Sequence, residues 1–277
     1  MPELPEVETI RKTLIPFVTN KTIKEVNVYW PKMVKEPDDV EQFKQILQGQ
    51  TIQKIGRRGK FLLFYMMEYV LVSHLRMEGK YRVVPSGEPV AKHTHVIFRF
   101  TDGEDLRYND VRKFGTMHVY PIGQEFQHKP LNKLGPEPFD QSFTSDYLYQ
   151  KLKRTERSVK AALLDQSIVT GLGNIYVDEA LFRAGVHPAK KANKLTKREV
   201  ERIWEQSIQT LSDAVKQGGT TIRSYVNGQG EMGMFQQELF VYGQENKECK
   251  HCGSPIIKIR VAGRGTHICT TCQKDKG

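Results

Sequence analysis

Several features are scarce or missing in this 277-residue sequence. It has no run of 18 or more uninterrupted apolar residues, so a helix that crosses a membrane is excluded. Its first ten residues contain three glutamates and no Lys or Arg, and they resemble neither a secretory signal nor a transit peptide. There is no internal repeat and no low-complexity run. We therefore expect a soluble intracellular protein, and the length favours two domains over one.

Cysteine is absent from the first 248 residues and then occurs four times. The four residues form two Cys-x2-Cys pairs separated by 16 residues: Cys249, Cys252, Cys269 and Cys272. Two such pairs can place four thiolates tetrahedrally around one zinc ion, whereas structural disulfides are not expected in a chain without a signal peptide. Four cysteine ligands leave no open coordination position. We therefore expect one structural Zn²⁺ and no catalytic metal.

The charge of the chain is strongly positive. Lys and Arg number 42 against 32 Asp and Glu, which gives a formal net charge of +10 and a pI near 9.3. Residues 247–277 contain seven basic and two acidic residues and so carry half of the net charge. A second basic cluster consists of Lys151, Lys153, Arg154, Arg157 and Lys160. This pattern favours a nucleic-acid partner, although a solvated basic surface is the plain alternative.

The front half of the chain combines a helix with many short strands. Apolar residues recur at helical spacing over residues 5–18, which predicts a helix with one buried face. From residue 22 to about 120 the pattern changes to short β-rich runs separated by Gly, Pro and Asp, with a further helix over 39–48. We therefore expect an antiparallel β-sandwich or barrel preceded by a helix.

The back half is helical and ends in strands. Residues 134–140 are rich in Pro and Gly, as is common between domains. Helical periodicity then predicts helices near residues 144–153, 157–165, 174–184 and 196–217. The tail alternates apolar and basic residues between the cysteine pairs, with a hairpin tip expected at residues 263–265. The fold class is thus α+β with more than one domain.

The first residues of the chain offer an unusual nucleophile. If Met1 is removed, Pro2 provides a secondary amine, and an α-amino group near pKa 8 is about one-tenth free base at pH 7, against about one in 2,500 for a lysine. Attack of this amine on a sugar C1′ gives an iminium with a fixed positive charge, which favours elimination of the 3′ phosphate. Glu3 and Glu6 are close enough in sequence to act as acid and base. The alternative interpretation is that the proline and the two glutamates only stabilise the N-terminus of a helix.

Three motifs together resemble a known family. The N-terminal MPELPEVET, the segment GLGNIYVDEALF at residues 171–182 and the terminal four-cysteine finger are similar to formamidopyrimidine-DNA glycosylases, in the same order over essentially the whole chain. The resemblance implies a bacterial base-excision repair enzyme that removes oxidised purines such as 8-oxoguanine and formamidopyrimidines. Pro2 would attack C1′ of the damaged nucleotide, and β,δ-elimination would then cut the strand. It also implies a monomer in the cytoplasm, associated with the nucleoid, that binds damaged double-stranded DNA and no membrane.

The resemblance also implies roles for individual residues. The catalytic residues would be Pro2, Glu3 as acid/base, Glu6 as support for the nucleophile, and Lys60 as a phosphate contact. Met77, Arg112 and Phe114 would fill the space left when the damaged nucleotide leaves the helix, although spacing alone places Met77 and Phe114 in a core. A glycine-rich stretch at residues 217–233 would cap the lesion. The implied DNA contacts are His74, Met77, Glu78, His93, Arg112, Phe114, Lys160, Asn174, Ile222, Arg223, Tyr225, Tyr242 and Arg264.

The domain assignment follows from the same comparison of motifs. Residues 1–133 would form the catalytic β-sandwich, residues 134–236 a helix–two-turn–helix domain with the lesion-capping loop, and residues 237–277 the zinc finger. Two alternatives stay open at this point. One is a non-enzymatic zinc-finger protein that only binds nucleic acid. The other is a related glycosylase for oxidised pyrimidines, of the endonuclease VIII type, against which the LPEVET sequence argues.

Overall fold

A computed structural model describes residues 1–220 and 233–274. The chain divides into two compact units: unit 1 is Met1–Asn132 with Thr220–Gly233, and unit 2 is Lys133–Gly219 with Met234–Gly277. Among the residues that the structure describes, no helix combines the length and the apolar character needed to span a membrane. The two units are described separately below.

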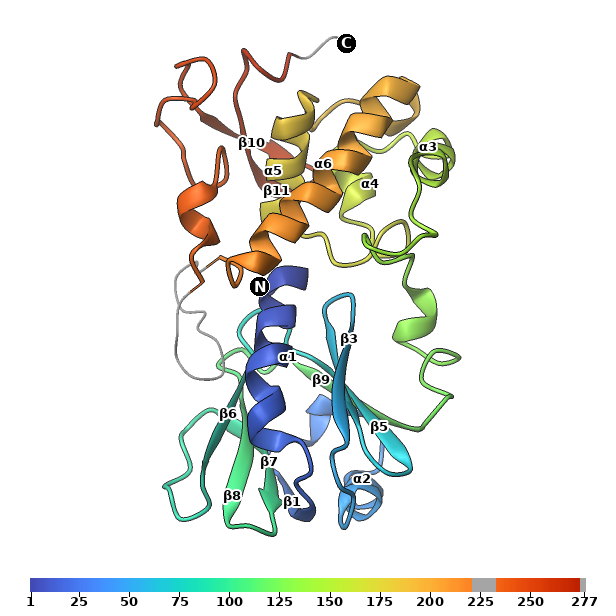
Figure 1. The fold of residues 1–277 in the computed structure, drawn as a ribbon, viewed down its shortest axis with the longest axis vertical. Coiled ribbons are helices and arrows are strands. Elements are labelled where there is room, and N and C mark those ends of the chain that lie inside the picture. Colours follow the sequence, from blue (N-terminus) through green and yellow to red (C-terminus); the bar gives the residue numbers. More distant parts are fainter. Residues whose placement is uncertain (221–232, 275–277) are drawn as a thin grey trace. The chain divides into compact units, whose positions relative to one another are not determined.

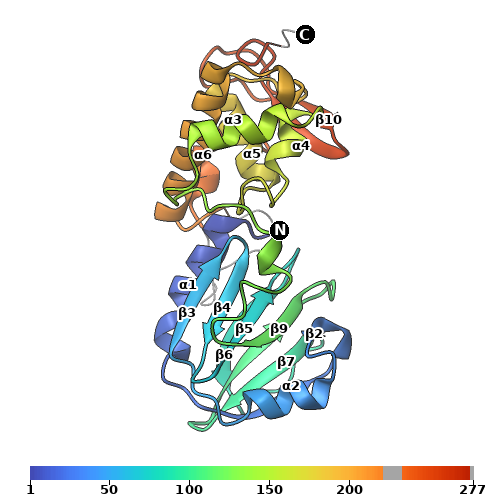
Figure 2. The same ribbon diagram turned by 90° about the vertical axis from the view of Figure 1, so that its right-hand side faces the viewer.

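Unit 1 is a sandwich of two β-sheets. One sheet has the strand order β1-β7-β8-β6 and the other β2-β9-β5-β4-β3 (Figures 1 and 2). All pairs are antiparallel except β2 and β9, which run parallel. The strands are β1 (Ile23–Val28), β2 (Val34–Glu36), β3 (Lys54–Arg58), β4 (Phe61–Tyr65), β5 (Tyr69–His74), β6 (Lys80–Pro85), β7 (Thr94–Phe100), β8 (Glu104–Asn109) and β9 (Thr116–Pro121).

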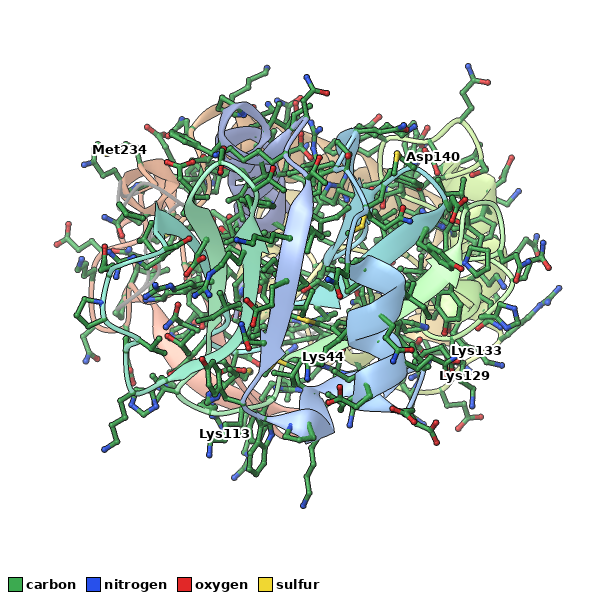
Figure 3. All side chains as sticks on the ribbon, turned by 90° about the horizontal axis from the view of Figure 1, so that it is seen from below. Lys44, Lys113, Lys129, Lys133, Asp140 and Met234 are labelled. Atoms are coloured by element: carbon green, nitrogen blue, oxygen red, sulfur yellow. The ribbon has the colours of Figure 1, made fainter. Side chains whose placement is uncertain are left out.

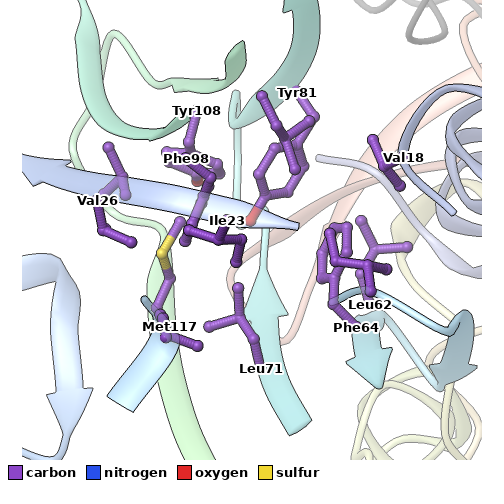
Figure 4. Packing of buried hydrophobic residues seen from close by; sticks show 14 of the residues in the cluster. Val18, Ile23, Val26, Leu62, Phe64, Leu71, Tyr81, Phe98, Tyr108 and Met117 are labelled. Atoms are coloured by element: carbon purple, nitrogen blue, oxygen red, sulfur yellow. The ribbon is translucent and has the colours of Figure 1, made fainter. Parts of the chain in front are cut away.

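The core of unit 1 lies between these sheets. Figure 4 shows Phe98 and Tyr108 of one sheet near Leu71 and Met117 of the other, and all four side chains are buried. Helix α2 (Val40–Leu47) begins after Asp39, whose carboxylate accepts the backbone N–H groups of residues 41 and 42. Its apolar side chains join the same core.

Helix α1 (Leu4–Val18) packs against the sheet that contains β3 and β4 (Figure 1). Val7, Ile10, Leu14 and Val18 recur at helical spacing and are buried in the core. Full burial of each such side chain stabilises the fold by roughly 1.5–3 kcal/mol. This packing fixes the position of the first turn of α1, which carries the glutamates predicted to be catalytic.

Unit 2 consists of helices and a short β-hairpin. Its helices are α3 (Ser145–Lys153), α4 (Val159–Leu163), α5 (Asn174–Ala184) and α6 (Lys197–Lys216), and its strands are β10 (Ile257–Val261) and β11 (Arg264–Ile268). Thr144, Ser158 and Thr196 cap α3, α4 and α6 with their hydroxyl groups, which explains where these helices begin. Single-turn 3-10 helices occur at Pro31–Met33, Leu131–Lys133, Ala192–Lys194 and Phe235–Glu238.

The structure confirms the α+β class and all six predicted helices, and it corrects two details. The sandwich is not wholly antiparallel, because β2 pairs in parallel with β9. The tip of the tail hairpin is Ala262–Gly263, not residues 263–265, since Val261 pairs directly with Arg264. Both tip residues have positive φ, 50° and 74°, as a two-residue turn that matches strand twist requires.

Candidate active site and DNA-binding residues

Three residues predicted to be catalytic lie at the start of α1: Pro2 and Glu3 directly precede the helix, and Glu6 is in its first turn. Pro2 is buried, and Glu3 and Glu6 are only 2% and 3% exposed. Glu6 Oε2 accepts the backbone N–H of Glu3 at 2.9 Å, so the glutamate fixes the backbone next to Pro2. Its other oxygen, Oε1, accepts the backbone N–H of Thr220 at 2.8 Å and the Thr220 hydroxyl at 3.1 Å. One carboxylate thus joins the start of the chain to Thr220, within the glycine-rich stretch at residues 217–233.

Lys60 and His74 lie close to each other in unit 1, at the start of β4 and the end of β5. Lys60 precedes β4 and is buried, and Phe61 beside it pairs with His74 at the end of β5. The two rings meet edge to face, with 4.4 Å between centroids. Burial, together with the positive charges of Arg76 and Lys60, lowers the pKa of His74 to about 3. His74 is therefore neutral at physiological pH, and since Nδ1 accepts the Arg76 N–H at 2.9 Å, Nε2 carries the proton and can donate it.

The low pKa of His74 predicts a loss of stability in acid. The ordinary pKa of a histidine is 6.5, so in the unfolded chain His74 binds a proton below that pH. In the folded protein the His74 ring stays neutral down to about pH 3. From pH 7 to pH 5 this single group is expected to remove about 2 kcal/mol from the free energy of unfolding. Urea unfolding at both pH values measures this drop. For His74→Gln the drop in the free energy of unfolding from pH 7 to pH 5 should be about 2 kcal/mol smaller than for the parent protein. Equal losses in the two proteins would contradict the assignment.

The three residues predicted to fill the vacated space lie at the surface of unit 1. Met77 follows β5 and is 38% exposed, and Phe114 lies between β8 and β9 and is 52% exposed. Arg112 is also exposed, and its guanidinium carbon lies 4.8 Å from the centre of the Phe114 ring. The alternative placement of Met77 and Phe114 in a core is therefore wrong. Glu78 and His93 are half-buried.

Two residues predicted to contact DNA are linked within unit 2. Asn174 is the first residue of α5, and its Nδ2 donates to the Gly265 carbonyl at 3.0 Å. Arg264 directly precedes Gly265 and is exposed beside the hairpin turn. The hydrogen bond thus ties the start of α5 to the strand that carries Arg264. An exposed arginine next to the positive end of a helix is a suitable place for a phosphate.

Tyr242 is half-buried and is held by its backbone. Its N–H donates to Glu179 Oε1 at 2.8 Å, and the same carboxylate also accepts the N–H groups of Phe240 and Val241. Burial raises the pKa of Glu179, although the three backbone hydrogen bonds lower it. Sequence reasoning did not single out Glu179, because a glutamate in a helix gives no signal of burial.

Lys160, which the resemblance implies as a DNA contact, is buried in unit 2. Its side chain is 0% exposed, and Nζ forms an ion pair with Asp178 Oδ1 at 2.6 Å. It also donates to the Thr266 hydroxyl at 2.8 Å and the Gly265 carbonyl at 3.3 Å. A buried lysine needs a partner of opposite charge, and Asp178 supplies it. The ammonium group therefore supports the hairpin strand β11.

Loss of this buried ion pair is expected to be costly. Lys160→Met leaves the Asp178 carboxylate buried without its cation, which should lower the free energy of unfolding by about 3–5 kcal/mol. Lys191→Met is a matched control, because Lys191 and Glu156 form an exposed pair at 3.9 Å whose loss should change stability by less than about 0.5 kcal/mol. Denaturant unfolding of both variants measures the difference. Equal midpoints for Lys160→Met and the parent would refute it.

The four cysteines meet at one place in unit 2. Their Sγ atoms all lie within 4.8 Å of one another, with 3.9 Å between Cys249 and Cys272 and 3.4 Å between Cys252 and Cys269. Four thiolates at about 2.3 Å from one zinc ion lie roughly 3.8 Å apart, so the cluster fits tetrahedral zinc. Hydrogen bonds from Ser254 lower the pKa of Cys252 to about 6, whereas burial raises the pKa of Cys269 and Cys272. The predicted structural zinc site is confirmed.

Three predicted contacts lie outside the described residues: Ile222, Arg223 and Tyr225.

Comparisons with known proteins agree with these features. The family model described as formamidopyrimidine-DNA glycosylase N-terminal domain matches residues 1–117, the model of the helix–two-turn–helix domain of the same enzymes matches residues 134–226, and a zinc finger found in FPG and IleRS matches residues 246–274. Formamidopyrimidine-DNA glycosylase of Oceanobacillus iheyensis is 68% identical, with 100% of this chain and 99% of that protein covered. The enzyme of Bacillus subtilis is 58% identical, with both chains fully covered.

Solved structures show the same similarity. The Lactococcus lactis enzyme in complex with DNA containing an abasic site is 42% identical, with a TM-score of 0.93 over 99% of this chain and 100% of that chain. The wild-type enzyme of the same organism, bound to DNA containing N7-benzyl-Fapy-dG, has a TM-score of 0.92 with the same identity and coverage. This chain belongs to the formamidopyrimidine-DNA glycosylase family.

Proposed function

We propose that this protein is a base-excision DNA repair enzyme that removes oxidised purines from duplex DNA and then cleaves the strand at the abasic site. Membership of the family supports the reaction class, and the relatives of known structure are complexes with damaged or abasic DNA. The observation that carries the assignment to this chain is the first turn of α1. Pro2 and the buried Glu3 directly precede this turn, and the buried Glu6 within it fixes the local backbone.

The chemistry begins at Pro2 once Met1 has been removed. Its nitrogen forms a bond to C1′, the bond from C1′ to the damaged base breaks, and opening of the sugar ring leaves a Pro2 iminium. The iminium withdraws electrons, so a proton is lost from C2′ and the 3′ phosphate departs by β-elimination. Loss of a C4′ proton and departure of the 5′ phosphate complete δ-elimination. Water then hydrolyses the iminium and regenerates the amine.

Two carboxyl groups serve different parts of this sequence. Glu3 is the acid/base: it protonates the ring oxygen or the departing base and later accepts a proton. Glu6 supports the nucleophile, because its carboxylate is occupied by the N–H of Glu3 and by both donor groups of Thr220. Lys60 binds a phosphate near the lesion, and the neutral His74 beside it donates a hydrogen bond from Nε2.

The remaining residues bind the distorted DNA. Met77, Arg112 and Phe114 fill the vacated stack and contact the orphaned base, which offsets the few kcal/mol that eversion of a nucleotide costs. Asn174, Tyr242 and Arg264 contact phosphates around the lesion, and His93 contacts the backbone. Glu78, Ile222, Arg223 and Tyr225 contact the everted base.

The organisation of the protein follows the same proposal. Residues 1–133 form the catalytic domain, residues 134–236 the helix–two-turn–helix domain and residues 237–277 the zinc finger. The protein acts as a monomer in the bacterial cytoplasm, where it associates with the nucleoid through DNA.

Borohydride trapping tests the proposal directly. The protein is incubated with a duplex that carries 8-oxoguanine opposite cytosine, and borohydride reduces the iminium to a stable amine that links protein and DNA. We expect a covalent adduct at the N-terminal residue, and cleavage of this duplex faster than of one containing thymine glycol. Absence of an adduct would overturn the proposed chemistry, and faster cleavage of thymine glycol would overturn the proposed substrate.

A further inference from the structure

The loop that carries Arg112 and Phe114 is organised by one buried carboxylate. Asp110 is 1% exposed and directly follows β8. Its Oδ1 accepts the backbone N–H of Arg112 at 3.0 Å, and its Oδ2 accepts those of Phe114 and Gly115, both at 2.9 Å. The Asp110 carbonyl accepts the N–H of Lys113 at 3.3 Å. Four consecutive N–H groups of the loop therefore bond to this residue.

Asp110 is itself anchored on both sides. Its N–H donates to the His93 carbonyl at 3.0 Å, and its carbonyl lies 2.7 Å from His95 Nε2. At the other end of the loop, a Cβ on Gly115 would lie 1.8 Å from the Tyr108 hydroxyl, so only glycine permits this approach. The base of the loop is thus tightly packed on β7 and β8.

The outer part of the loop is exposed. Lys113 lies at the edge of the molecule in Figure 3, with Nζ 4.1 Å from the centre of the Trp30 ring. Its φ of 59° is a strained conformation for lysine, which the hydrogen bonds to Asp110 help to maintain. On either side of it, Arg112 and Phe114 project into solvent. A rigid base with exposed cationic and aromatic side chains suits insertion into a base stack, because little ordering remains to be done on binding.

We propose that Asp110 is a positioning residue for nucleotide eversion, which holds the backbone of residues 112–115 so that Arg112 and Phe114 enter the DNA in one geometry. Asp110 does not contact DNA. The inference rests on the proposed function, since it concerns how the space left by the damaged nucleotide is filled. It adds a residue to which neither the resemblance nor the charge pattern pointed.

The hydrogen bonds at position 110 require a side chain with two acceptor oxygens. An amide has one acceptor oxygen and one donor nitrogen, whereas both oxygens of Asp110 accept. Asp110→Asn can keep at most the two bonds to Phe114 and Gly115, and its NH2 group then faces the N–H of Arg112. Asp110→Ala loses all three. The two variants therefore weaken the loop to different degrees, and Asp110→Asn does so with little change in volume.

The test separates eversion from the later chemistry. Excision of 8-oxoguanine from a duplex requires eversion, whereas cleavage of a single-stranded oligonucleotide with a ready-made abasic site does not. We expect Asp110→Asn to slow excision roughly tenfold and Asp110→Ala more strongly, with single-strand cleavage within about twofold of the parent. Asp39→Asn is the matched control, because Asp39 also accepts two backbone N–H groups but caps the distant helix α2. It should leave both reactions unchanged.

A second experiment distinguishes the loss of positioning from a general loss of stability in Asp110 variants. In a Phe114→Ala, Arg112→Ala background the wedge is already lost, so Asp110→Asn should slow excision no further. A further tenfold loss in that background would overturn the inference, as would equal slowing of duplex excision and single-strand cleavage. An Asp110→Asn protein that excises at the parent rate would overturn it too. If the parent protein excises nothing, the proposed function itself fails, which is a distinguishable result.

Discussion

Pro2→Gly is expected to reduce strand cleavage at 8-oxoguanine by a factor of roughly 1,000 or more. Glycine also permits removal of Met1, so the variant still has a free N-terminal amine, but a primary amine gives an imine with no fixed positive charge. Glycine also lacks the ring that directs the nitrogen. Gel analysis of cleaved strands and of borohydride-trapped adducts measures both effects. DNA affinity and its salt dependence should stay within about threefold, because the phosphate contacts are elsewhere.

The state of the N-terminus provides the control for this experiment. In the chain that begins at Met1, the Pro2 nitrogen is part of a peptide bond and has no lone pair for attack. A form that retains Met1 should therefore bind damaged DNA and fail to cleave it, like Pro2→Gly. Mass spectrometry of the purified N-terminus identifies which form is present. Full cleavage by a protein that retains Met1, or by Pro2→Gly, would contradict the assignment of the nucleophile.

The helices were predictable because their signals are local. Residues 196–217 contain a capping threonine, a glutamate three positions later and apolar residues at helical spacing, and α6 spans Lys197–Lys216. Strand β8 was not predicted, because its sequence EDLRYN is charged. Its Asp105 and Arg107 are nevertheless buried, and they pair with each other at 3.0 Å. Leu106 and Tyr108 are its only core side chains, and an alternation this short is a weak signal, so the neighbours in the sheet decide its conformation.

The site was predictable only where its residues are close in sequence. The four cysteines and the first turn of α1 follow from spacing, but the contact from Glu6 to Thr220 joins positions 214 residues apart. Lys160 illustrates the same limit: its partner Asp178 lies on another helix, and no property of the sequence marks that pair as buried. A basic cluster identified from sequence therefore includes one lysine that is buried. Asp110 was not predicted for a related reason: its hydrogen-bond partners are backbone N–H groups, which every loop possesses.

Removal of zinc is expected to have the second largest effect, a loss of affinity for abasic-site DNA of roughly 100-fold or more. The hairpin β10–β11 has only two strands, and an isolated hairpin is at best marginally stable in water. The small apolar cluster beside the hairpin consists of Phe182, Val241, Cys249, Ile256 and Cys269, so two of its five buried side chains are zinc ligands. Zinc binding contributes about 10–16 kcal/mol to the folding of comparable fingers. Without the metal the hairpin should therefore unfold.

The loss of affinity follows from what the hairpin carries. Arg264 is on β11, so unfolding of the hairpin removes this proposed phosphate contact. The neighbouring Gly265 carbonyl accepts hydrogen bonds from Asn174 and Lys160, so unfolding also releases Asn174, a second proposed phosphate contact. Charge-assisted hydrogen bonds contribute about 1.5–3 kcal/mol each, and the loss of two accounts for about 100-fold or more. Fluorescence anisotropy before and after chelation, with Cys252→Ser in parallel, measures this effect. Added Zn²⁺ should restore binding to the chelated protein but not to Cys252→Ser, whereas unchanged affinity after verified metal removal would show that the finger holds its structure, or binds DNA, without zinc.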